Sequence, residues 1–174
     1  MTDKMLEAFD GTRTAGAIAS SALDEVTKII RPGIKTDEID KLCYEFINDN
    51  GAYSAPLFYR GFPKSCCTSP NHTVCHGIPK DKILKEGDIL NVDVTSLKNG
   101  WHGDTSRMYF VGEVSTKAKK LVNTTYQAMI NSIKILKSGV HLGDLGSFVP
   151  EDNSTKNISS LKILEEVIDK LRSI

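Results

Sequence analysis

The sequence predicts an α+β domain in which helices cover one face of a mainly antiparallel sheet. In the middle of the chain, two β-rich runs flank Asn99-Gly100, and this dipeptide is the strongest short-range signal for a tight hairpin. On both sides of the hairpin, apolar residues recur at helical spacing. With 174 residues, of which 40% are hydrophobic and 25% charged, the chain has the composition of one ordinary globular domain.

Two helices are expected before the hairpin. Apolar residues recur with a helical period over residues 10–30, and the Pro-Gly pair at 32–33 ends that helix. Thr36 is predicted to be the N-cap of a second helix, which the Asn-Gly pair at 50–51 closes. Residues 52–75 lack a helical period and predict a loop followed by one or two short strands, the last at Thr73–Cys75.

A third helix is predicted after the hairpin, capped by Ser115 or Thr116 and ended by the Ser-Gly pair at 138–139. Its expected inward residues are Ala118, Leu121, Val122, Met129, Ile130, Ile133 and Leu136. The composition changes after Gly146. The sequence therefore predicts a first region of residues 1–146 and a second of residues 147–174, made of a polar linker and an amphipathic C-terminal helix.

Each hairpin strand carries one acidic residue, Asp93 or Asp104, where a core strand would place an apolar one. If Asn99 and Gly100 form the turn, the register places both aspartates on one face, one pair apart on a diagonal. Diagonal neighbours lie roughly 7–8 Å apart, and two carboxylates held so close repel each other. A divalent metal pair between them is the simplest explanation, and a solvated sheet face is the alternative.

His76 follows the last predicted strand and precedes Gly77, which allows a close backbone approach. A lone histidine is more often structural than catalytic. Here Tyr59, Phe62 and Cys67 lie upstream and are candidates to line an apolar recess near it. Together these residues favour a binding site over a purely structural role.

The overall charge offers no reason to expect nucleic-acid binding, because 22 basic residues balance 22 acidic ones. No apolar run reaches the length of a membrane span, and the first residues lack the pattern of an export signal. We therefore expect a cytoplasmic protein that contacts neither membrane nor nucleic acid. Its four cysteines are expected to be free thiols.

Four segments together resemble one enzyme family. They are Tyr59-Arg-Gly-Phe-Pro-Lys-Ser65, Asn71 with Val74-Cys-His-Gly-Ile-Pro79, Glu86-Gly-Asp-Ile-Leu-Asn-Val-Asp-Val-Thr95, and Gly103-Asp-Thr-Ser-Arg-Met108. The combination closely resembles the type I methionine aminopeptidases, metal-dependent exopeptidases with a pita-bread (creatinase/aminopeptidase-like) fold. The resemblance runs from about Gly11 to Gly146 and matches the N-terminal portion of that family, which implies a partial pita-bread fold.

The resemblance implies a role for each candidate residue. Asp93 and Asp104 match two of the family's metal ligands, and His76 matches a histidine that contacts the substrate near the scissile amide. Tyr59, Phe62 and Cys67 match residues around the pocket for the methionine side chain. A complete site of this family holds two divalent ions, with cobalt, manganese, iron and zinc as the candidates.

The implied function is removal of the N-terminal methionine from peptides and nascent proteins by two-metal-assisted hydrolysis. The family's second half supplies one more histidine and two glutamates as ligands. Their only later counterparts, His141, Glu151, Glu165 and Glu166, stand in unrelated contexts. A second function therefore stays open: a non-catalytic pita-bread fragment that acts as a binding module or assembles with a complementary chain. Prolidase-type or Xaa-Pro peptidase activity is a third, less favoured alternative.

Overall fold

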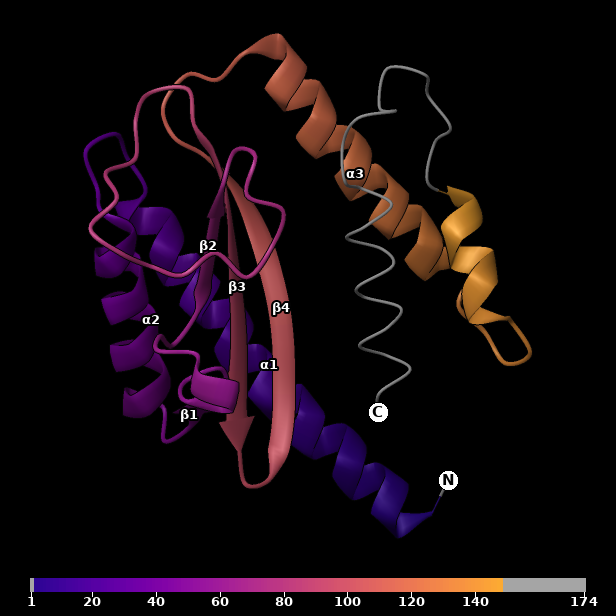
Figure 1. Ribbon diagram of the computed structural model, residues 1–174. Helices are drawn as coiled ribbons and strands as arrows, with labels where there is room; N and C mark the ends of the chain where they lie inside the picture. The colour runs from indigo at the N-terminus through magenta and orange to yellow at the C-terminus, as the bar shows by residue number, and fades with distance from the viewer. Residues whose placement is uncertain (1, 149–174) are drawn as a thin grey trace. The chain divides into compact units, whose positions relative to one another are not determined.

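The computed structural model describes residues 2–148, and the chain divides after Val114 into two compact units. The elements of the first unit are α1 (Asp3–Ile29), α2 (Thr36–Asp49), β1 (Tyr53–Ser54), the 3-10 segment η1 (Tyr59–Gly61), β2 (Cys67–Pro70), β3 (Ile89–Lys98) and β4 (Trp101–Phe110). The described elements of the second unit are α3 (Thr116–Lys134) and the 3-10 segment η2 (Leu142–Phe148). Figure 1 shows the elements along the chain.

The predicted hairpin is confirmed. β3 and β4 pair antiparallel with Lys98 opposite Trp101, and Asn99 and Gly100 form the turn between them with φ angles of 52° and 85°. Two successive positive φ angles are the requirement of the tight turn that Asn-Gly favours. β2 and the two-residue β1 both pair antiparallel with the other edge of β3, so β3 is the central strand of this sheet.

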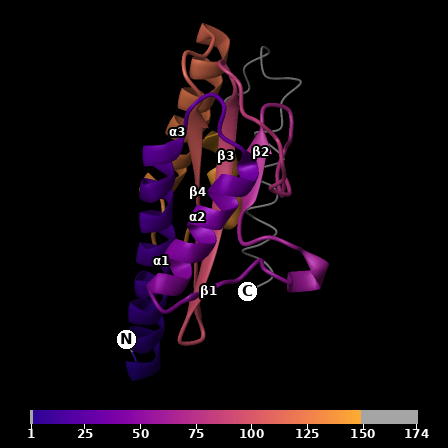
Figure 2. The ribbon, with the colours of Figure 1, turned by 90° about the vertical axis from the view of Figure 1, so that its left-hand side faces the viewer.

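The first unit has two layers, with α1 and α2 on the same side of the sheet, as Figures 1 and 2 show. Alternate residues of β3 point toward these helices, and Leu90, Val92 and Val94 are fully buried there. Ser96 continues this row, and its hydroxyl donates to the carbonyl of Ala15 in α1 at 2.7 Å. The prediction of an α+β fold with helices on one sheet face is therefore confirmed.

Glycine at position 103 lets α1 lie close against β4. A Cβ atom placed on Gly103 would lie 2.0 Å from the backbone nitrogen of Gly16 in α1, well inside van der Waals contact. On the same strand face, the Tyr109 hydroxyl donates to the carbonyl of Leu23 at 2.6 Å. These contacts fix α1 on the side of β4 that faces away from Asp104.

The starts of both N-terminal helices differ from the prediction. α1 begins at Asp3, where the Thr2 hydroxyl accepts from the amide of Met5. The sequence predicts a later start because the helical period of apolar residues marks only the part of the helix that packs on the sheet. The N-cap of α2 is Lys35 rather than Thr36. The Glu38 carboxylate accepts from the Lys35 amide at 2.9 Å, and this leaves the Thr36 hydroxyl for another partner.

The strand predicted at Thr73–Cys75 is wrong. The strand in this region is β2, and it ends where Asn71 adopts a left-handed φ of 51°. The Asn71 side chain donates to Asp88 and accepts from the amide of Ile89, so it joins the end of β2 to the start of β3. The β-propensity of the valine-containing run favoured a strand at Thr73–Cys75. The hydrogen bonds of the Asn71 side chain leave no periodic pattern in the sequence, so they could not be predicted from it.

The third helix is capped by Ser115 as predicted, but it ends at Lys134, before the Ser-Gly pair at 138–139. Its buried residues are Ala128 and Ser132, and the Ser132 hydroxyl donates to the carbonyl of Leu145 in η2 at 3.1 Å. The predicted inward side is wrong for Met129, Ile133 and Leu136, whose side chains are exposed in the described part of the chain. The η2 segment covers a different side of the helix.

No helix within residues 2–148 is long and apolar enough to cross a membrane. The C-terminal helix expected from the sequence falls among residues 149–174, outside the described residues.

Candidate functional site

The two aspartates share one face of the hairpin, as their spacing predicts. Asp93 lies opposite Ser106, and Asp104 lies opposite Thr95, two residues further along β3 from Asp93. Residues two apart on a strand point to the same side, so the carboxylates of Asp93 and Asp104 lie on a diagonal, roughly 7–8 Å apart by standard sheet geometry. This face is the one opposite α1 and α2, because the alternate residues Val92 and Val94 are buried against the helices.

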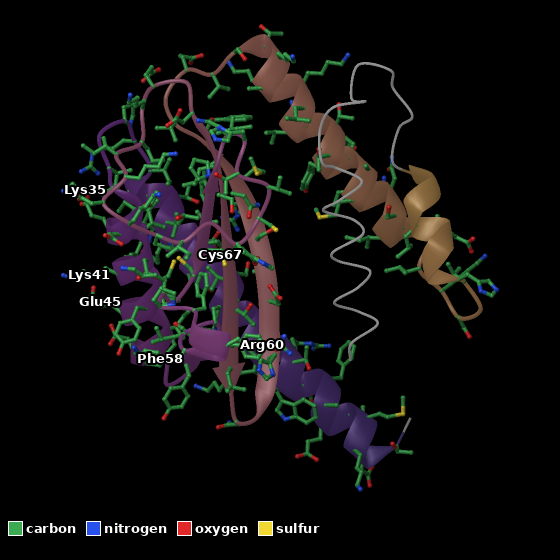
Figure 3. The ribbon with its side chains drawn as sticks, in the orientation of Figure 1. Lys35, Lys41, Glu45, Phe58, Arg60 and Cys67 are labelled. Atoms are coloured by element: carbon green, nitrogen blue, oxygen red, sulfur yellow. The ribbon has the colours of Figure 1, made fainter. Side chains whose placement is uncertain are left out.

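A third candidate, Cys67, joins this face from the neighbouring strand. Cys67 on β2 pairs directly with Asp93 on β3, so three adjacent strands contribute Cys67, Asp93 and Asp104 to one surface. Figure 3 labels Cys67 over the sheet. The preceding Cys66 belongs to the core instead, where a hydrogen bond to Cys43 and then burial raise the pKa of its thiol. Cys66 therefore stays a neutral structural thiol.

The start of β2 is held by α2 through a carboxylate that sequence reasoning missed. Asp40 accepts hydrogen bonds from the amide of Ser65 at 2.7 Å, from the Ser65 hydroxyl at 2.6 Å and from the amide of Cys66 at 3.2 Å. The adjacent Lys64 ammonium pairs with Asp37 at 2.7 Å, and this hydrogen bond raises the pKa of Lys64. The acidic residues at the start of α2 were the available sequence signal for these contacts. The helix dipole alone explains acids there, so nothing in the sequence indicated partners in a distant segment.

The aromatic candidates lie in the loop around η1. Phe58 and Arg60 both adopt left-handed backbone conformations, and the Phe58 amide donates to the carbonyl of Phe62 at 2.7 Å. Figure 3 shows Phe58 and Arg60 at the end of the sheet where β1 lies. The Arg60 guanidinium lies over the Tyr59 ring, 5.5 Å from its centroid. Tyr59 is 64% exposed, whereas Phe62 is half-buried. The described residues therefore do not enclose Tyr59 in a recess.

His76 lies outside any strand and has a left-handed φ of 51°. The next residue, Gly77, is bound to β2: its carbonyl accepts from the amide of Thr68 at 2.8 Å, and its amide donates to the Ser69 hydroxyl at 3.1 Å. A Cβ on Gly77 would lie 2.1 Å from the carbonyl oxygen of Thr68, so the predicted close approach is confirmed. The backbone of His76 thus runs beside the strand whose Cys67 pairs with Asp93.

The chemistry of the donors fits a hard divalent cation, which prefers carboxylate oxygens. The described residues contain no group of three or more His, Cys, Asp or Glu side chains placed to hold a metal ion, so Asp93 and Asp104 by themselves do not form a complete coordination shell. Of the later candidates, His141 is exposed and its amide donates to Asp144 within the second unit. Glu151, Glu165 and Glu166 lie outside the described residues.

The chain is similar in sequence to methionine aminopeptidases. The chain is 48% identical over 154 residues to the methionine aminopeptidase of Rickettsia prowazekii, covering 88% of this chain and 60% of that protein. It is 43% identical over 143 residues to methionine aminopeptidase 2 of Mycobacterium tuberculosis, covering 82% of this chain and 50% of that protein. The chain thus spans about half to three-fifths of the length of these curated relatives.

Solved structures show the same fold. The crystal structure of the Rickettsia prowazekii methionine aminopeptidase matches with a TM-score of 0.81 and 49% identity, over 86% of this chain and 59% of that one. The methionine aminopeptidase of Thermotoga maritima matches with a TM-score of 0.82 and 34% identity, over 87% and 60%. A Xaa-Pro dipeptidase from Bacillus anthracis, 21% identical with a TM-score of 0.74, shares the fold. The predicted pita-bread architecture is therefore confirmed for the part of the fold that the chain covers.

The chain also matches a family model over most of its length. The model of metallopeptidase family M24 covers residues 10–156, which include most of α1, all of α2, His76 and the hairpin. Together with the methionine aminopeptidase relatives, this match shows that the chain belongs to metallopeptidase family M24.

Proposed function

We propose that the chain carries part of the active site of a metal-dependent aminopeptidase that removes the N-terminal methionine from peptides and nascent proteins. The observation that supports this most is the shared sheet face of Asp93 and Asp104. Two carboxylates at this spacing repel each other weakly in water, and a divalent cation bound between them would replace that repulsion by attraction to both.

In this proposal Asp93 and Asp104 bind the divalent cation from two neighbouring strands. The candidate ions are cobalt, manganese, iron and zinc, two of them in a complete site. When bound, such ions supply a water molecule of lowered pKa as the nucleophile for peptide hydrolysis. The two carboxylates set where that chemistry takes place, on the face of β3 and β4 away from the helices.

The remaining candidates orient the substrate. His76 has an exposed side chain on a backbone held against β2, and we assign it to donate a hydrogen bond to the peptide near the scissile amide. Cys67, Tyr59 and Phe62 are assigned to the methionine side chain, whose polarizable thioether suits aromatic and sulfur contacts. Cys67 supports this assignment best, since it lies directly beside Asp93.

The proposed place of action is the cytoplasm, where nascent chains are made and thiols stay reduced. None of the four cysteines forms a disulfide, in keeping with that compartment. A complementary polypeptide is the proposed source of the coordination positions that Asp93 and Asp104 leave open. We propose no contact with membranes or nucleic acids.

The test is release of methionine from a Met-Ala-type peptide, with and without added Mn²⁺ or Co²⁺. Any metal-stimulated release by the unaltered chain is expected to disappear in Asp93→Ala and in Asp104→Ala. Ser106→Ala is the matched control, because Ser106 lies on the same face opposite Asp93 and carries no charge. Equal release by the two aspartate variants and the unaltered chain would exclude the proposed role of the pair.

A second candidate function is a non-catalytic pita-bread portion that acts as a binding or assembly module. It is favoured by one observation: residues 2–148 contain no group of three or more His, Cys, Asp or Glu side chains placed to hold a metal ion. Calorimetric titration with Mn²⁺ distinguishes the two. A folded chain that retains no divalent ion supports the binding module, whereas a saturable heat signal that both aspartate variants lose supports the enzyme.

A further inference from the structure

The segment that follows His76 is attached to the rest of the first unit at two places. At one end, Gly77 bonds to β2 through the backbone of Thr68 and through the side chain of Ser69. At the other end, Lys80 bonds to the first residue of α2, Thr36. Pro79 between them is fully buried. The two attachments come from different elements, a strand and a helix, and they lie three residues apart.

The attachment at Thr36 joins its side-chain hydroxyl to the backbone of Lys80. The Thr36 hydroxyl donates to the carbonyl of Lys80 at 2.8 Å and accepts from the amide of Lys80 at 3.0 Å. The same carbonyl also accepts from the amide of Asp37 at 3.1 Å, and the amide of Thr36 donates to the carbonyl of Lys82 at 3.0 Å. Thr36 itself is 1% exposed, so water cannot readily replace its hydroxyl.

The attachment at Ser69 has the same character. Ser69 is buried and its hydroxyl accepts from the Gly77 amide, the first peptide N–H after His76. His76 itself holds a left-handed backbone, which is unfavourable for a residue with a Cβ and persists only where neighbouring contacts fix it. The bonds that Gly77 makes to β2 are contacts of that kind.

We propose that Thr36 and Ser69 are positioning residues that hold His76 beside the sheet face of Asp93. Neither residue touches the reacting atoms in this proposal; each fixes the backbone on which the imidazole is carried. The inference rests on the proposed role of His76 in substrate binding, and it goes beyond that role by naming the groups that set the geometry of His76. Through Thr36, helix α2 thereby helps to position a residue of the proposed substrate site, although α2 lies on the opposite side of the sheet.

The experiment uses isotope-labelled full chain and compares Thr36→Val with Thr36→Ser. Valine keeps the shape of threonine and removes the hydroxyl, whereas serine keeps the hydroxyl and removes the methyl group. We expect Thr36→Val to speed amide exchange of Lys80 about five- to tenfold, to speed exchange of Gly77 by a smaller factor, and to shift the imidazole resonances of His76. Thr36→Ser is expected to restore all three.

The control is Thr125→Val, which removes a hydroxyl that donates to the carbonyl of Leu121 within α3. It is expected to leave Lys80 and His76 unchanged. Should Thr36→Val fail to fold, Ser69→Ala tests the other attachment by the same readouts, with exchange of Gly77 as the primary one. Unchanged His76 resonances in a folded Thr36→Val or Ser69→Ala variant would overturn the proposal, and so would a Thr36→Ser variant that behaves like Thr36→Val.

Two added measurements separate this inference from the proposed function. Calorimetric Mn²⁺ binding, if present in the unaltered chain, is expected to persist in Thr36→Val, because Asp93 and Asp104 are untouched. Addition of a Met-Ala peptide is expected to shift the His76 imidazole in the unaltered chain and to shift it less in Thr36→Val. No response in the unaltered chain would refute the substrate role of His76, whereas an equal response in both proteins would refute positioning by Thr36.

Discussion

Replacing Asp104 by asparagine should reveal the repulsion that the hairpin stores between its two carboxylates. At roughly 7–8 Å, two unit negative charges repel by about 0.5 kcal/mol in water and by about 2 kcal/mol at the effective dielectric near a protein surface. Asp104 is exposed, so the smaller value applies and salt reduces it further. Asp104→Asn should therefore leave the metal-free protein slightly more stable, even though it removes a proposed ligand.

The same variant should lose the stabilisation that a bound cation provides. With free Mn²⁺ at ten times its dissociation constant, binding to the folded state adds about 1.4 kcal/mol. For a chain of this size that corresponds to a rise of roughly 3–6 °C in the unfolding midpoint. In Asp104→Asn the Mn²⁺-dependent rise should fall below about 1 °C, because one of the two carboxylates is gone.

The assay is thermal unfolding followed by the fluorescence of Trp101, the single tryptophan of the sequence, which lies on β4 and so reports on this sheet. Ser106→Ala is the control and should keep the Mn²⁺ effect. A metal-free midpoint of Asp104→Asn that lies clearly below that of the unaltered chain would contradict the expected relief of repulsion. A Mn²⁺-dependent rise as large in the variant as in the unaltered chain would refute the proposed ligand role of Asp104.

Three further outcomes follow from packing and hydrogen bonding. Gly103→Ala should destabilise the chain by about 1–3 kcal/mol in denaturant unfolding, because the added Cβ meets the backbone of α1. Gly16→Ala should stabilise it by up to about 1 kcal/mol, because a Cβ there meets nothing within 4 Å. The reverse order of the two stabilities would contradict the packing of α1 on β4. Burial raises the pKa of Tyr109 to about 12, so the folded state keeps a proton that the unfolded state releases near pH 10, and stability should fall between about pH 10 and 12. In Tyr109→Phe this part of the alkaline loss should disappear, and an unchanged pH profile would refute the assignment. Ser132→Ala should cost about 1 kcal/mol and loosen η2, seen as faster amide exchange near Leu145, and unchanged exchange there would count against the hydroxyl contact.

The hairpin and the shared face of its aspartates could be predicted from the sequence because both depend on local information. The Asn-Gly turn fixes the register, and the register fixes which side chains lie opposite each other. Asp93 and Asp104 therefore lie as their positions in the sequence predict. The helical period likewise located the parts of α1 and α2 that pack on the sheet.

The contacts that hold the site residues could not be predicted in this way, because they join segments far apart in the sequence. The bond between Thr36 and Lys80 spans 44 residues, and those of Asp40 with Ser65 span 25. Local rules assigned Thr36 to a helix cap, since threonine is a favoured N-cap residue. In the structure Lys35 takes that position, and the Thr36 hydroxyl serves the segment after His76 instead.

The most direct test of a cation held jointly by Asp93 and Asp104 is paramagnetic broadening of backbone amide signals by Mn²⁺. Substoichiometric Mn²⁺ should broaden the amides of Asp93, Thr95 and Asp104 before all others, and replacing either aspartate with asparagine should abolish this pattern. Broadening that begins instead around the acidic residues Asp37 and Asp40 of α2, or that persists at β3 and β4 in both variants, would contradict a cation site on this face of the hairpin.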